Sequence, residues 1–485
     1  MLRLTLIAVL LLSHTVVAQP APAPAPEVEA SRPAGSDRTT THTLRLPGRT
    51  LAFNATVSTM RLANPQGAVQ TEVVTTAFIR ADTVGPRPVT FVFNGGPGAS
   101  SAWLNLGAIG PWRIPFSGVP SAKPELLDNA ETWLDFTDLV FLDPPGTGFS
   151  RVIATGDDVR RRIYSVDGDI QTLAVVVRRW LEGNRRLQSP KFLAGESYGG
   201  FRAPRLARTL LDEQGVGVNG LVLVSPVLDF NGRDAPWSPM EHVGRLPSMA
   251  AAASNASGRA ELREVEEYAV TEFLQDLMRG ERDSAATARL GTRVAAFIGM
   301  DPALVRLRAG RVGISTFVRD REPGRVASPY DATVTATDPF PAAANDNSPD
   351  PILDGLRGPV TSAMLELYTR LGWAPEGAPA RQYQLLNTAV NREWDFGRGN
   401  RRPESFGDLR QFLALDSTVG VLVTHGLTDL VTPYFSTKLL LDQIPETVGA
   451  DRIRLQAYPG GHMFYSRDSS RAALHEDAGQ TIRIR

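Results

Sequence analysis

The chain contains no cysteine. A disulfide-held scaffold, a zinc finger and a cysteine-ligated iron–sulfur protein are therefore excluded. An excess of one charge is also missing, because 51 basic residues oppose 52 acidic residues and the net charge is −1. No overall field draws such a chain to nucleic acid, and we expect no nucleic-acid partner. With 485 residues, 42% of them hydrophobic, the chain can bury a large core, which excludes a disordered or collagen-like protein.

Long apolar runs are rare in this sequence, and one of them, at the N-terminus, indicates a targeting segment. Arg3 precedes an apolar run over residues 4–12, and the small residues Val16 and Ala18 follow it. This pattern predicts a secretory signal peptide over residues 1–18, cleaved after Ala18, since the run is too short to span a bilayer. The alternative is a buried N-terminal helix. No later stretch reaches about 18 uninterrupted apolar residues, so we expect no stable membrane span.

A linker rich in proline and alanine is predicted over residues 19–40. Its repeated prolines hold the backbone near polyproline II, so it forms a stiff tether without a packed core. An exported chain without cysteine does not depend on an oxidising compartment for its stability. This combination favours a secreted or periplasmic protein of a bacterial envelope.

The pattern of apolar residues predicts an α/β fold. Residues 41–46, 51–60 and 69–79 alternate in polarity and are rich in β-branched side chains, which predicts antiparallel strands. Continuous apolar runs follow, several of them succeeded by a glycine-rich turn and a helical segment. Short buried runs that alternate with helices predict a mostly parallel central sheet with flanking helices. The runs are residues 89–93, 139–142, 192–194, 221–224, 419–423 and 453–458.

The strand signal fades between residues 237 and 393. Residues 260–278 and 361–371 within this stretch have helical spacing instead. We therefore expect a helical cap, inserted between a first core segment, residues 41–236, and a second, residues 394–485.

A nucleophilic serine is indicated by residues 195–200, which read Gly-Glu-Ser-Tyr-Gly-Gly. The pattern Gly-x-Ser-x-Gly between a strand and a helix is typical of the nucleophile elbow, whose tight turn needs glycine and exposes the serine hydroxyl. Ser197 is the expected nucleophile. The alternative is a simple turn from strand to helix.

A serine hydroxyl attacks only when a base removes its proton. Of the six histidines, His462 follows the strand at residues 453–458 through a Pro-Gly-Gly turn and is the expected base, whereas His425 is expected to be packed or to line the site. Asp429 follows the strand at residues 419–423, and it fits the carboxylate that orients the base. The alternative role for Asp429 is an N-cap of the next helix. The order Ser, Asp, His is that of α/β-hydrolases.

A glycine-rich turn over residues 94–101 follows the strand at residues 89–93 and reads Asn-Gly-Gly-Pro-Gly-Ala-Ser-Ser. Its backbone N–H groups have no side chain in their way. One of them, with the N–H of Tyr198, would form an oxyanion hole. No metal or organic cofactor is expected, because the histidines are scattered and neither a His-Glu-x-x-His helix nor a Walker-type loop occurs.

Three motifs in this order resemble the serine carboxypeptidases of peptidase family S10. They are residues 94–101, residues 141–150 (Phe-Leu-Asp-Pro-Pro-Gly-Thr-Gly-Phe-Ser) and residues 195–200. Asp429 and His462 follow in that family's order. The resemblance covers the two core segments, matches the cap only by position, and implies an α/β-hydrolase fold.

The resemblance also implies a role for each matching residue. Ser197 would be the nucleophile, His462 the general base and Asp429 its orienting acid. The N–H groups of Gly96 and Tyr198 would form the oxyanion hole.

Recognition of the C-terminal carboxylate of a substrate is the second implied task. The resemblance assigns it to Asn94, the N–H of Gly95 and Glu196. Glu196 can hold a carboxylate only when protonated, because two carboxylates at hydrogen-bond distance repel, and the family's preference for acidic pH follows. Ala99 replaces a disulfide-forming cysteine of many eukaryotic members. Ala108 stands where those enzymes carry a second acid, which leaves Glu196 without that partner.

The sequence therefore predicts a serine carboxypeptidase that releases single residues from peptides with a free C-terminus through an acyl-enzyme. An esterase or acyltransferase on the same scaffold is the alternative, because Ala108 removes one carboxylate-recognising acid. A non-catalytic envelope binding protein is the third hypothesis. The sequence predicts no particular oligomeric state.

Overall fold

The computed structural model describes residues 37–83, 87–116, 124–231, 235–343, 348–375, 382–397 and 402–483. All of these residues belong to the unit Pro33–Arg485. The predicted signal peptide and most of the predicted linker lie outside the described residues. Within those residues, no helix has the length and apolar character needed to cross a membrane.

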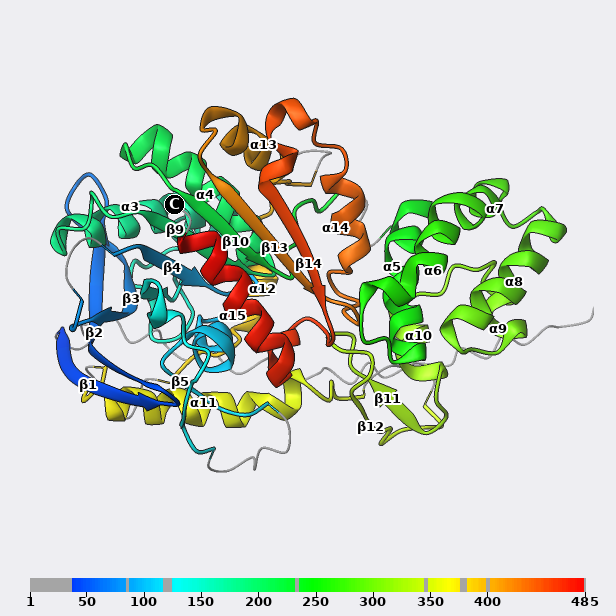
Figure 1. Cartoon of the computed structure of the whole chain (residues 1–485), viewed down its shortest axis with the longest axis horizontal. Helices are drawn as coiled ribbons and strands as arrows, with labels where there is room; N and C mark the ends of the chain where they lie inside the picture. The colour runs from blue at the N-terminus through cyan, green and yellow to red at the C-terminus, as the bar shows by residue number, and fades with distance from the viewer. Residues whose placement is uncertain are drawn as a thin grey trace, which may run out of the picture. The chain divides into compact units, whose positions relative to one another are not determined.

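One mixed sheet forms the centre of the fold, and ten strands of the described chain belong to it (Figure 1). Their order is β1-β2-β3-β7-β4-β9-β10-β13-β14, with β8 paired to β3. The strands are β1 (Arg38–Leu46), β2 (Arg49–Ala63), β3 (Val69–Arg80), β4 (Val89–Phe93), β7 (Asp138–Leu142), β8 (Arg151–Val152), β9 (Lys191–Glu196), β10 (Gly220–Val224), β13 (Gly420–Gly426) and β14 (Ile453–Tyr458).

The direction of the strands follows the sequence pattern. Strands β1, β2 and β3 pair antiparallel, as does β3 with β7. From β7 through β4, β9, β10 and β13 to β14 every pair is parallel. Strands such as β4 and β10 are buried along their whole length because helices cover both faces of a parallel sheet. The predicted α/β-hydrolase type of fold, with N-terminal antiparallel strands and a mostly parallel sheet, is confirmed.

The first strand begins earlier than the sequence pattern indicated. Arg38, Thr39 and Thr40 pair with residues of β2, so β1 includes the end of the predicted linker, residues 19–40. Three consecutive threonines favour a strand, since β-branched side chains fit its pleated surface.

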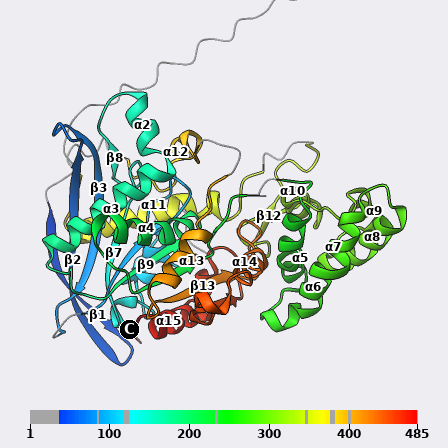
Figure 2. The same cartoon turned by 90° about the horizontal axis from the view of Figure 1, so that it is seen from above.

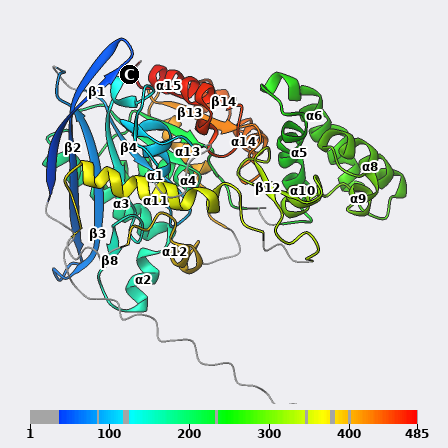
Figure 3. The ribbon, with the colours of Figure 1, turned by 90° about the horizontal axis from the view of Figure 1, so that it is seen from below.

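Helices cover the two faces of the sheet. Helices α3 (Val166–Gly183), α4 (Tyr198–Gln214) and α13 (Phe406–Leu415) lie on one side of the sheet (Figure 2). Helices α11 (Leu353–Arg370) and α15 (Asp468–Arg483) lie on the other side (Figure 3). The apolar side chains of each set share a cluster with the face that they cover. The sheet is therefore the middle of three layers, as burial of both its faces requires.

The chain between β10 and β13 is mainly helical. Helices α5 to α10 share an apolar cluster of their own, which continues into Leu427, Leu430, Tyr434 and Phe435 after β13. Helix α11 differs, because its buried side chains pack with the sheet. The stretch expected as a cap, residues 237–393, therefore contains one helix that belongs to the layer beneath the sheet.

The remaining elements are short or connect those already named. Shorter strand pairs are β5 (Trp112–Arg113) with β6 (Leu127–Asp128) and β11 (Arg325–Ala327) with β12 (Thr335–Thr337). The other helices and helical turns are α1 (Ala102–Leu104), η1 (Asn105–Ile109), η2 (Trp133–Asp135), α2 (Asp157–Ile163), α5 (Pro239–Ser254), η3 (Arg259–Leu262), α6 (Arg263–Tyr268), η4 (Ala269–Phe273), α7 (Leu274–Arg279), α8 (Ser284–Ile298), α9 (Pro302–Leu307), α10 (Ile314–Asp320), α12 (Thr388–Glu393), α14 (Tyr434–Leu441), η5 (Glu446–Val448), η6 (Ala450–Arg452) and η7 (Phe464–Ser466).

Candidate active site

Ser197 occupies a strained turn between β9 and α4. Its φ of 61° and ψ of −119° lie outside the regions that residues with a Cβ atom normally adopt. Hydrogen bonds hold this conformation: the Ser197 N–H donates to the carbonyl of Val224 at 2.9 Å, and the Gly200 N–H donates to the carbonyl of Ser197 at 2.9 Å. The serine therefore stands at the carboxyl end of the sheet, directly before helix α4.

The glycines of this motif are required by packing. A Cβ atom added at Gly195 would collide with the carbonyl oxygen of Gly199, and one at Gly199 would lie 2.7 Å from the carbonyl oxygen of Phe93. A Cβ at Gly200 would collide with Pro226. The pattern Gly-x-Ser-x-Gly is thus required because β9, α4 and the neighbouring strand ends approach one another too closely for a Cβ atom at these glycines.

Asp429 and His462 form a buried hydrogen-bonded pair. The Nδ1 atom of His462 lies 2.7 Å from Oδ2 of Asp429, and the two residues are 2% and 0% exposed. Thr432 donates its hydroxyl to Oδ2 at 2.6 Å, and the N–H groups of Val431 and Thr432 donate to Oδ1 at 2.8 and 3.0 Å. Burial alone would raise the pKa of Asp429, but His462 and the bonds from Thr432 hold this pKa below its usual value. Asp429 is therefore an ionised partner for the imidazole.

The backbone of His462 is fixed from two sides. Its N–H donates to the carbonyl of Tyr330 at 2.5 Å, and its carbonyl accepts the hydroxyl of Ser225 at 2.7 Å. The Tyr330 ring meets the imidazole edge to face, with 5.4 Å between centroids. Ser225 directly follows Val224, the residue that binds the Ser197 N–H, so one strand end contacts the loops of both Ser197 and His462.

His425 is the second histidine near this pair, and it is fully buried. Its Nδ1 lies 3.0 Å from the carbonyl oxygen of Thr432, so Nδ1 carries a hydrogen. Burial lowers the pKa of His425 to about 4, which keeps the ring neutral. His425 therefore supports the loop that presents Asp429 and Thr432.

The turn over residues 94–101 lies against the N-terminus of α4. A Cβ atom at Gly95 would be 2.5 Å from the backbone nitrogen of Tyr198 and 3.0 Å from Cβ of Ser197. Gly96 has a φ of +99°, a conformation that glycine adopts without strain. The backbone at Gly95 thus approaches Ser197 and Tyr198 with no side chain between them.

Asp143 connects the second motif, residues 141–150, to this turn. Its Oδ1 accepts the N–H and the hydroxyl of Ser101 at 2.8 and 2.7 Å. Burial raises the pKa of Asp143 to about 6. A Cβ at Gly148 would collide with the Asp143 carboxylate. The motif therefore has a structural task, which is to fix the glycine-rich turn.

Glu196 lies next to Ser197 and is only 4% exposed. The hydroxyl of Tyr465 donates to its Oε2 at 2.6 Å, and the side chain of Asn94 also hydrogen-bonds to this carboxyl group. Burial raises the pKa of Glu196 to about 7, while His462, Tyr465 and Asn94 oppose that rise. A carboxyl group with this pKa is protonated in about half of the molecules at neutral pH.

Tyr465 and Thr432 were not singled out by the sequence analysis. Tyr465 stands three residues after His462, and Thr432 three residues after Asp429. Their position close to predicted site residues is the only signal for them in the sequence. Asn94, Gly95, Glu196, Ser197 and Tyr198, by contrast, are brought together as their motifs indicated.

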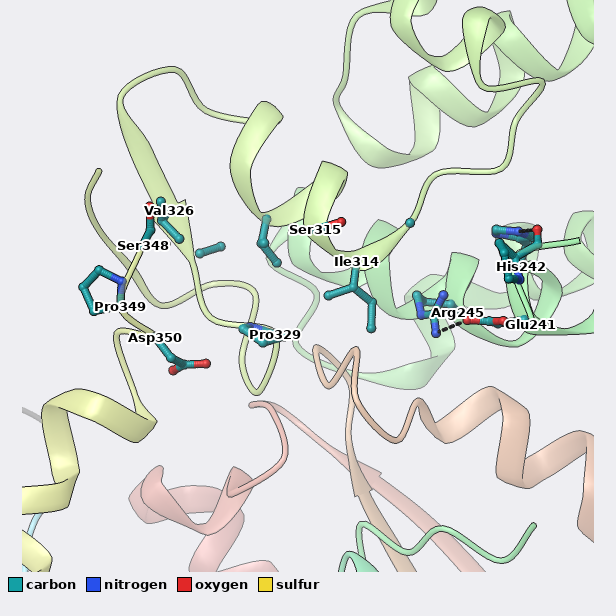
Figure 4. A pocket seen from close by; sticks show the side chains of 14 residues that line it. Glu241, His242, Arg245, Ile314, Ser315, Val326, Pro329, Ser348, Pro349 and Asp350 are labelled. Atoms are coloured by element: carbon teal, nitrogen blue, oxygen red, sulfur yellow. Dashed lines mark hydrogen bonds and ion pairs between the residues drawn. The ribbon is translucent and has the colours of Figure 1, made fainter. Parts of the chain in front are cut away.

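A cavity of about 470 Å³ lies between α5, α10 and β11 (Figure 4). Ile314 and Pro329 contribute to its walls, and an ion pair of 3.0 Å between Glu241 and Arg245 lies at the α5 side. No member of the predicted triad is among the described residues that line it. Pro329 precedes Tyr330, so the cavity wall and the support of His462 belong to one loop. The described residues also contain no cluster of three or more metal-ligating side chains.

Comparison with known proteins finds a family model that matches part of the chain. Residues 78–243 match the family model described as Serine carboxypeptidase, Peptidase_S10. Over 125 residues the chain is 34% identical to the pheromone-processing carboxypeptidase KEX1 of Coprinopsis cinerea, which covers 26% of this chain and 19% of that protein. Over 180 residues it is 30% identical to serine carboxypeptidase-like 51 of Arabidopsis thaliana, which covers 35% and 36%. The chain thus spans about a fifth to a third of the length of these relatives.

A solved structure extends the likeness of fold to most of the chain. The crystal structure of Kex1(delta)p, a prohormone-processing carboxypeptidase from Saccharomyces cerevisiae, aligns with a TM-score of 0.58 and 16% identity over 89% of this chain and 91% of that one. At this identity the match concerns the fold. The matched family segment contains the three motifs on which the resemblance rests, including the turn with Ser197. Residues 78–243, with these motifs, are thus the part of the chain that matches the serine carboxypeptidase family, peptidase family S10.

Proposed function

We propose that this protein is a serine carboxypeptidase that releases C-terminal residues from peptides through an acyl-enzyme on Ser197. One observation carries the proposal: the buried His462–Asp429 pair is tied to the same strand end, residues 224–225, as the strained turn that presents Ser197. A strained serine and a carboxylate-oriented histidine at one sheet edge are the parts that acyl transfer needs.

The proposed reaction uses His462 first as a base and then as an acid. Because Asp429 accepts the Nδ1 hydrogen, Nε2 of His462 is left with a lone pair for the Ser197 proton. The Ser197 Oγ then bonds to the scissile carbonyl carbon, and the negative charge on its oxygen is held by the N–H groups of Gly96 and Tyr198. His462 gives the proton to the leaving nitrogen, and the C–N bond breaks. Water, activated by the same imidazole, hydrolyses the acyl-enzyme.

Carboxylate recognition distinguishes an exopeptidase from other acyl-transfer enzymes. Asn94, the Gly95 N–H and protonated Glu196 would hold the terminal carboxylate of the substrate. The pKa of Glu196, raised to about 7 by burial, supports this role because a protonated Glu196 donates a hydrogen bond where an ionised one would repel.

The decisive experiment compares a blocked dipeptide with its C-terminal amide between pH 5 and 9. Glu196 is protonated below its folded pKa of about 7, so we expect kcat/KM for the dipeptide to be high there and to fall about tenfold per pH unit above it. The amide, which lacks the carboxylate, should be cleaved more slowly and without this fall. Equal cleavage of both substrates at every pH would contradict carboxylate recognition.

Two outcomes lead to the other hypotheses. If the amide is cleaved equally well and an ester faster than either, an esterase or acyltransferase is favoured, as Ala108 suggests. If folded protein cleaves none of them and a fluorophosphonate probe does not label Ser197, the non-catalytic binding protein replaces both.

Gly95→Ala is expected to damage the oxyanion hole. The new Cβ would lie 2.5 Å from the Tyr198 nitrogen, so the backbone must move away from the position that holds the developing negative charge. Loss of one oxyanion donor lowers kcat by about 10²- to 10³-fold. Initial-rate assays of dipeptide hydrolysis at saturating substrate measure this fall in kcat. Gly183→Ala is the control, because nothing lies within 4 Å of its added Cβ. Wild-type kcat in Gly95→Ala would contradict the predicted site of the hole.

The proposal also covers where the protein is located and how its chain is divided into domains. We infer a signal peptide over residues 1–18, cleaved after Ala18, and a secreted or periplasmic enzyme. The hydrolase core would comprise residues 41–236 and 394–485, with residues 237–393 as the insertion, in which α5 to α10 would form the cap and α11 packs with the core. N-terminal sequencing of the exported protein tests the cleavage position.

A further inference from the structure

Glu196 and Tyr465 form a buried pair that the proposed mechanism has not yet used. The Tyr465 hydroxyl lies 2.6 Å from Oε2 of Glu196, and the two residues are 0% and 4% exposed. Glu196 ends β9, whereas Tyr465 belongs to η7 in the loop after β14. The contact therefore joins the nucleophile turn to the chain that carries His462.

The Tyr465 ring is held in place by its neighbours. A Cβ atom at Gly107 would lie 2.6 Å from Cε2 of Tyr465, so the ring occupies space that any larger residue at position 107 would need. The rings of Phe116 and Phe464 contact it, with centroids 6.1 and 5.8 Å away. A ring enclosed on these sides cannot turn its hydroxyl away from Glu196 without displacing them.

The electrostatic surroundings keep the tyrosine a donor. Burial and the nearby Glu196 raise the pKa of Tyr465 well above its usual value, so its hydroxyl stays protonated. The other groups that act on Glu196 are the side chain of Asn94 and the charges of His462 and Asp429. Among these neighbours, Tyr465 and Asn94 are neutral and hydrogen-bond directly to the carboxyl group.

We propose that Tyr465 is a positioning residue for carboxylate recognition. Its hydroxyl makes Oε2 of Glu196 an acceptor, so that the acid proton resides on Oε1, where it can be donated to the terminal carboxylate of the substrate. Tyr465 thereby supplies the partner for Glu196 that Ala108, in the neighbouring helical turn η1, does not provide. This inference rests on the proposed function and adds a residue to it.

Tyr465→Phe removes the donor and keeps the ring. Without the bond Glu196 is less well oriented, so KM for the blocked dipeptide should rise about tenfold while kcat stays within about twofold. A hydrogen bond to the ionised carboxylate also lowers its pKa. Its loss should therefore move the alkaline limb of the kcat/KM profile upward by about one pH unit. The C-terminal amide should show neither change.

Matched variants separate positioning from simple damage. Gly107→Ala, which pushes against the same ring, should reproduce the rise in KM. Tyr434→Phe is the control, because Tyr434 is equally buried and donates to Glu266 at 2.8 Å, outside the site. It should leave both KM and the alkaline limb unchanged. Equal losses on dipeptide and amide in Tyr465→Phe, or an unchanged KM and pH profile, would overturn the inference.

Glu196→Leu distinguishes failure of this inference from failure of the proposed function, because leucine removes the donor that glutamine would keep. If Glu196→Leu keeps the full preference for the dipeptide over its amide, carboxylate recognition by Glu196 is wrong and the function must be revised. If Glu196→Leu loses that preference and its alkaline limb while Tyr465→Phe behaves as wild type, only the role of Tyr465 is wrong.

Discussion

Ser197→Ala is expected to abolish release of the C-terminal residue from a blocked dipeptide, with kcat falling by about 10⁵- to 10⁶-fold. No other group would form the acyl-enzyme, and the oxyanion hole and substrate binding alone supply only a small residual rate. The fold should survive, because alanine keeps the Cβ atom and the backbone bonds of Ser197 to Val224 and Gly200 remain. The rate is measured by chromatography of the released amino acid.

Covalent labelling gives an independent readout for the same variant. A fluorophosphonate probe should add one equivalent to the wild type and none to Ser197→Ala. Ser254→Ala is the control, since that hydroxyl only bonds to Ala250 within α5. Dipeptide hydrolysis by Ser197→Ala at the rate of Ser254→Ala would refute the nucleophile.

Asp429→Asn is expected to lower kcat by about 10⁴-fold, the second largest effect. Two backbone N–H groups, of Val431 and Thr432, donate to Oδ1, so the asparagine oxygen takes that position. Its NH₂ group then faces Nδ1 of His462, where Oδ2 now lies 2.7 Å away. The imidazole must place its hydrogen on Nε2 to accept this bond, and Nε2 can then no longer take the proton of Ser197. The single-turnover rate on the dipeptide measures this loss.

Thr432→Val is the matched comparison for Asp429→Asn. It removes the hydroxyl that donates to Oδ2 at 2.6 Å but leaves the carboxylate in contact with His462. The tautomer of His462 is preserved, so the loss in kcat should be about tenfold. If Asp429→Asn were no slower than Thr432→Val, the orienting role of Asp429 would be wrong.

Much of the fold was predictable because local pattern and tertiary structure agree. Segments rich in β-branched residues, with changes of polarity along them, indicated the antiparallel strands, and continuous apolar runs indicated the parallel ones. The turn at Ser197 was equally predictable, since its glycines at positions 195 and 199 are required by contacts within the turn and with the adjacent strand end. Such contacts leave a short motif in the sequence.

Contacts between distant segments left no such motif. Tyr465 and Glu196 are 269 positions apart, so the sequence around Ala108 indicated only that an acid is missing there and not that Tyr465 is the partner of Glu196. The ring of Tyr465 fits because residue 107 is glycine, a relation that only the packed structure reveals. Helix α11 was likewise recognisable as a helix, but its spacing did not indicate that it packs on the sheet.

Tyr330 ties the chain between β10 and β13 to His462, because its carbonyl accepts the backbone N–H of His462 and its aromatic ring contacts the imidazole. Excising that chain to obtain a minimal hydrolase would therefore leave His462 without two of its supports. The apolar cluster of helices α5 to α9 also includes Leu427 and Leu430 on either side of the Asp429 loop, so changes of length or sequence are expected where these helices lie away from that loop and from residues 328–332. Diversification of this protein, in nature or in the laboratory, is thus expected in the outer helices and not in the loops that contact His462 and Asp429.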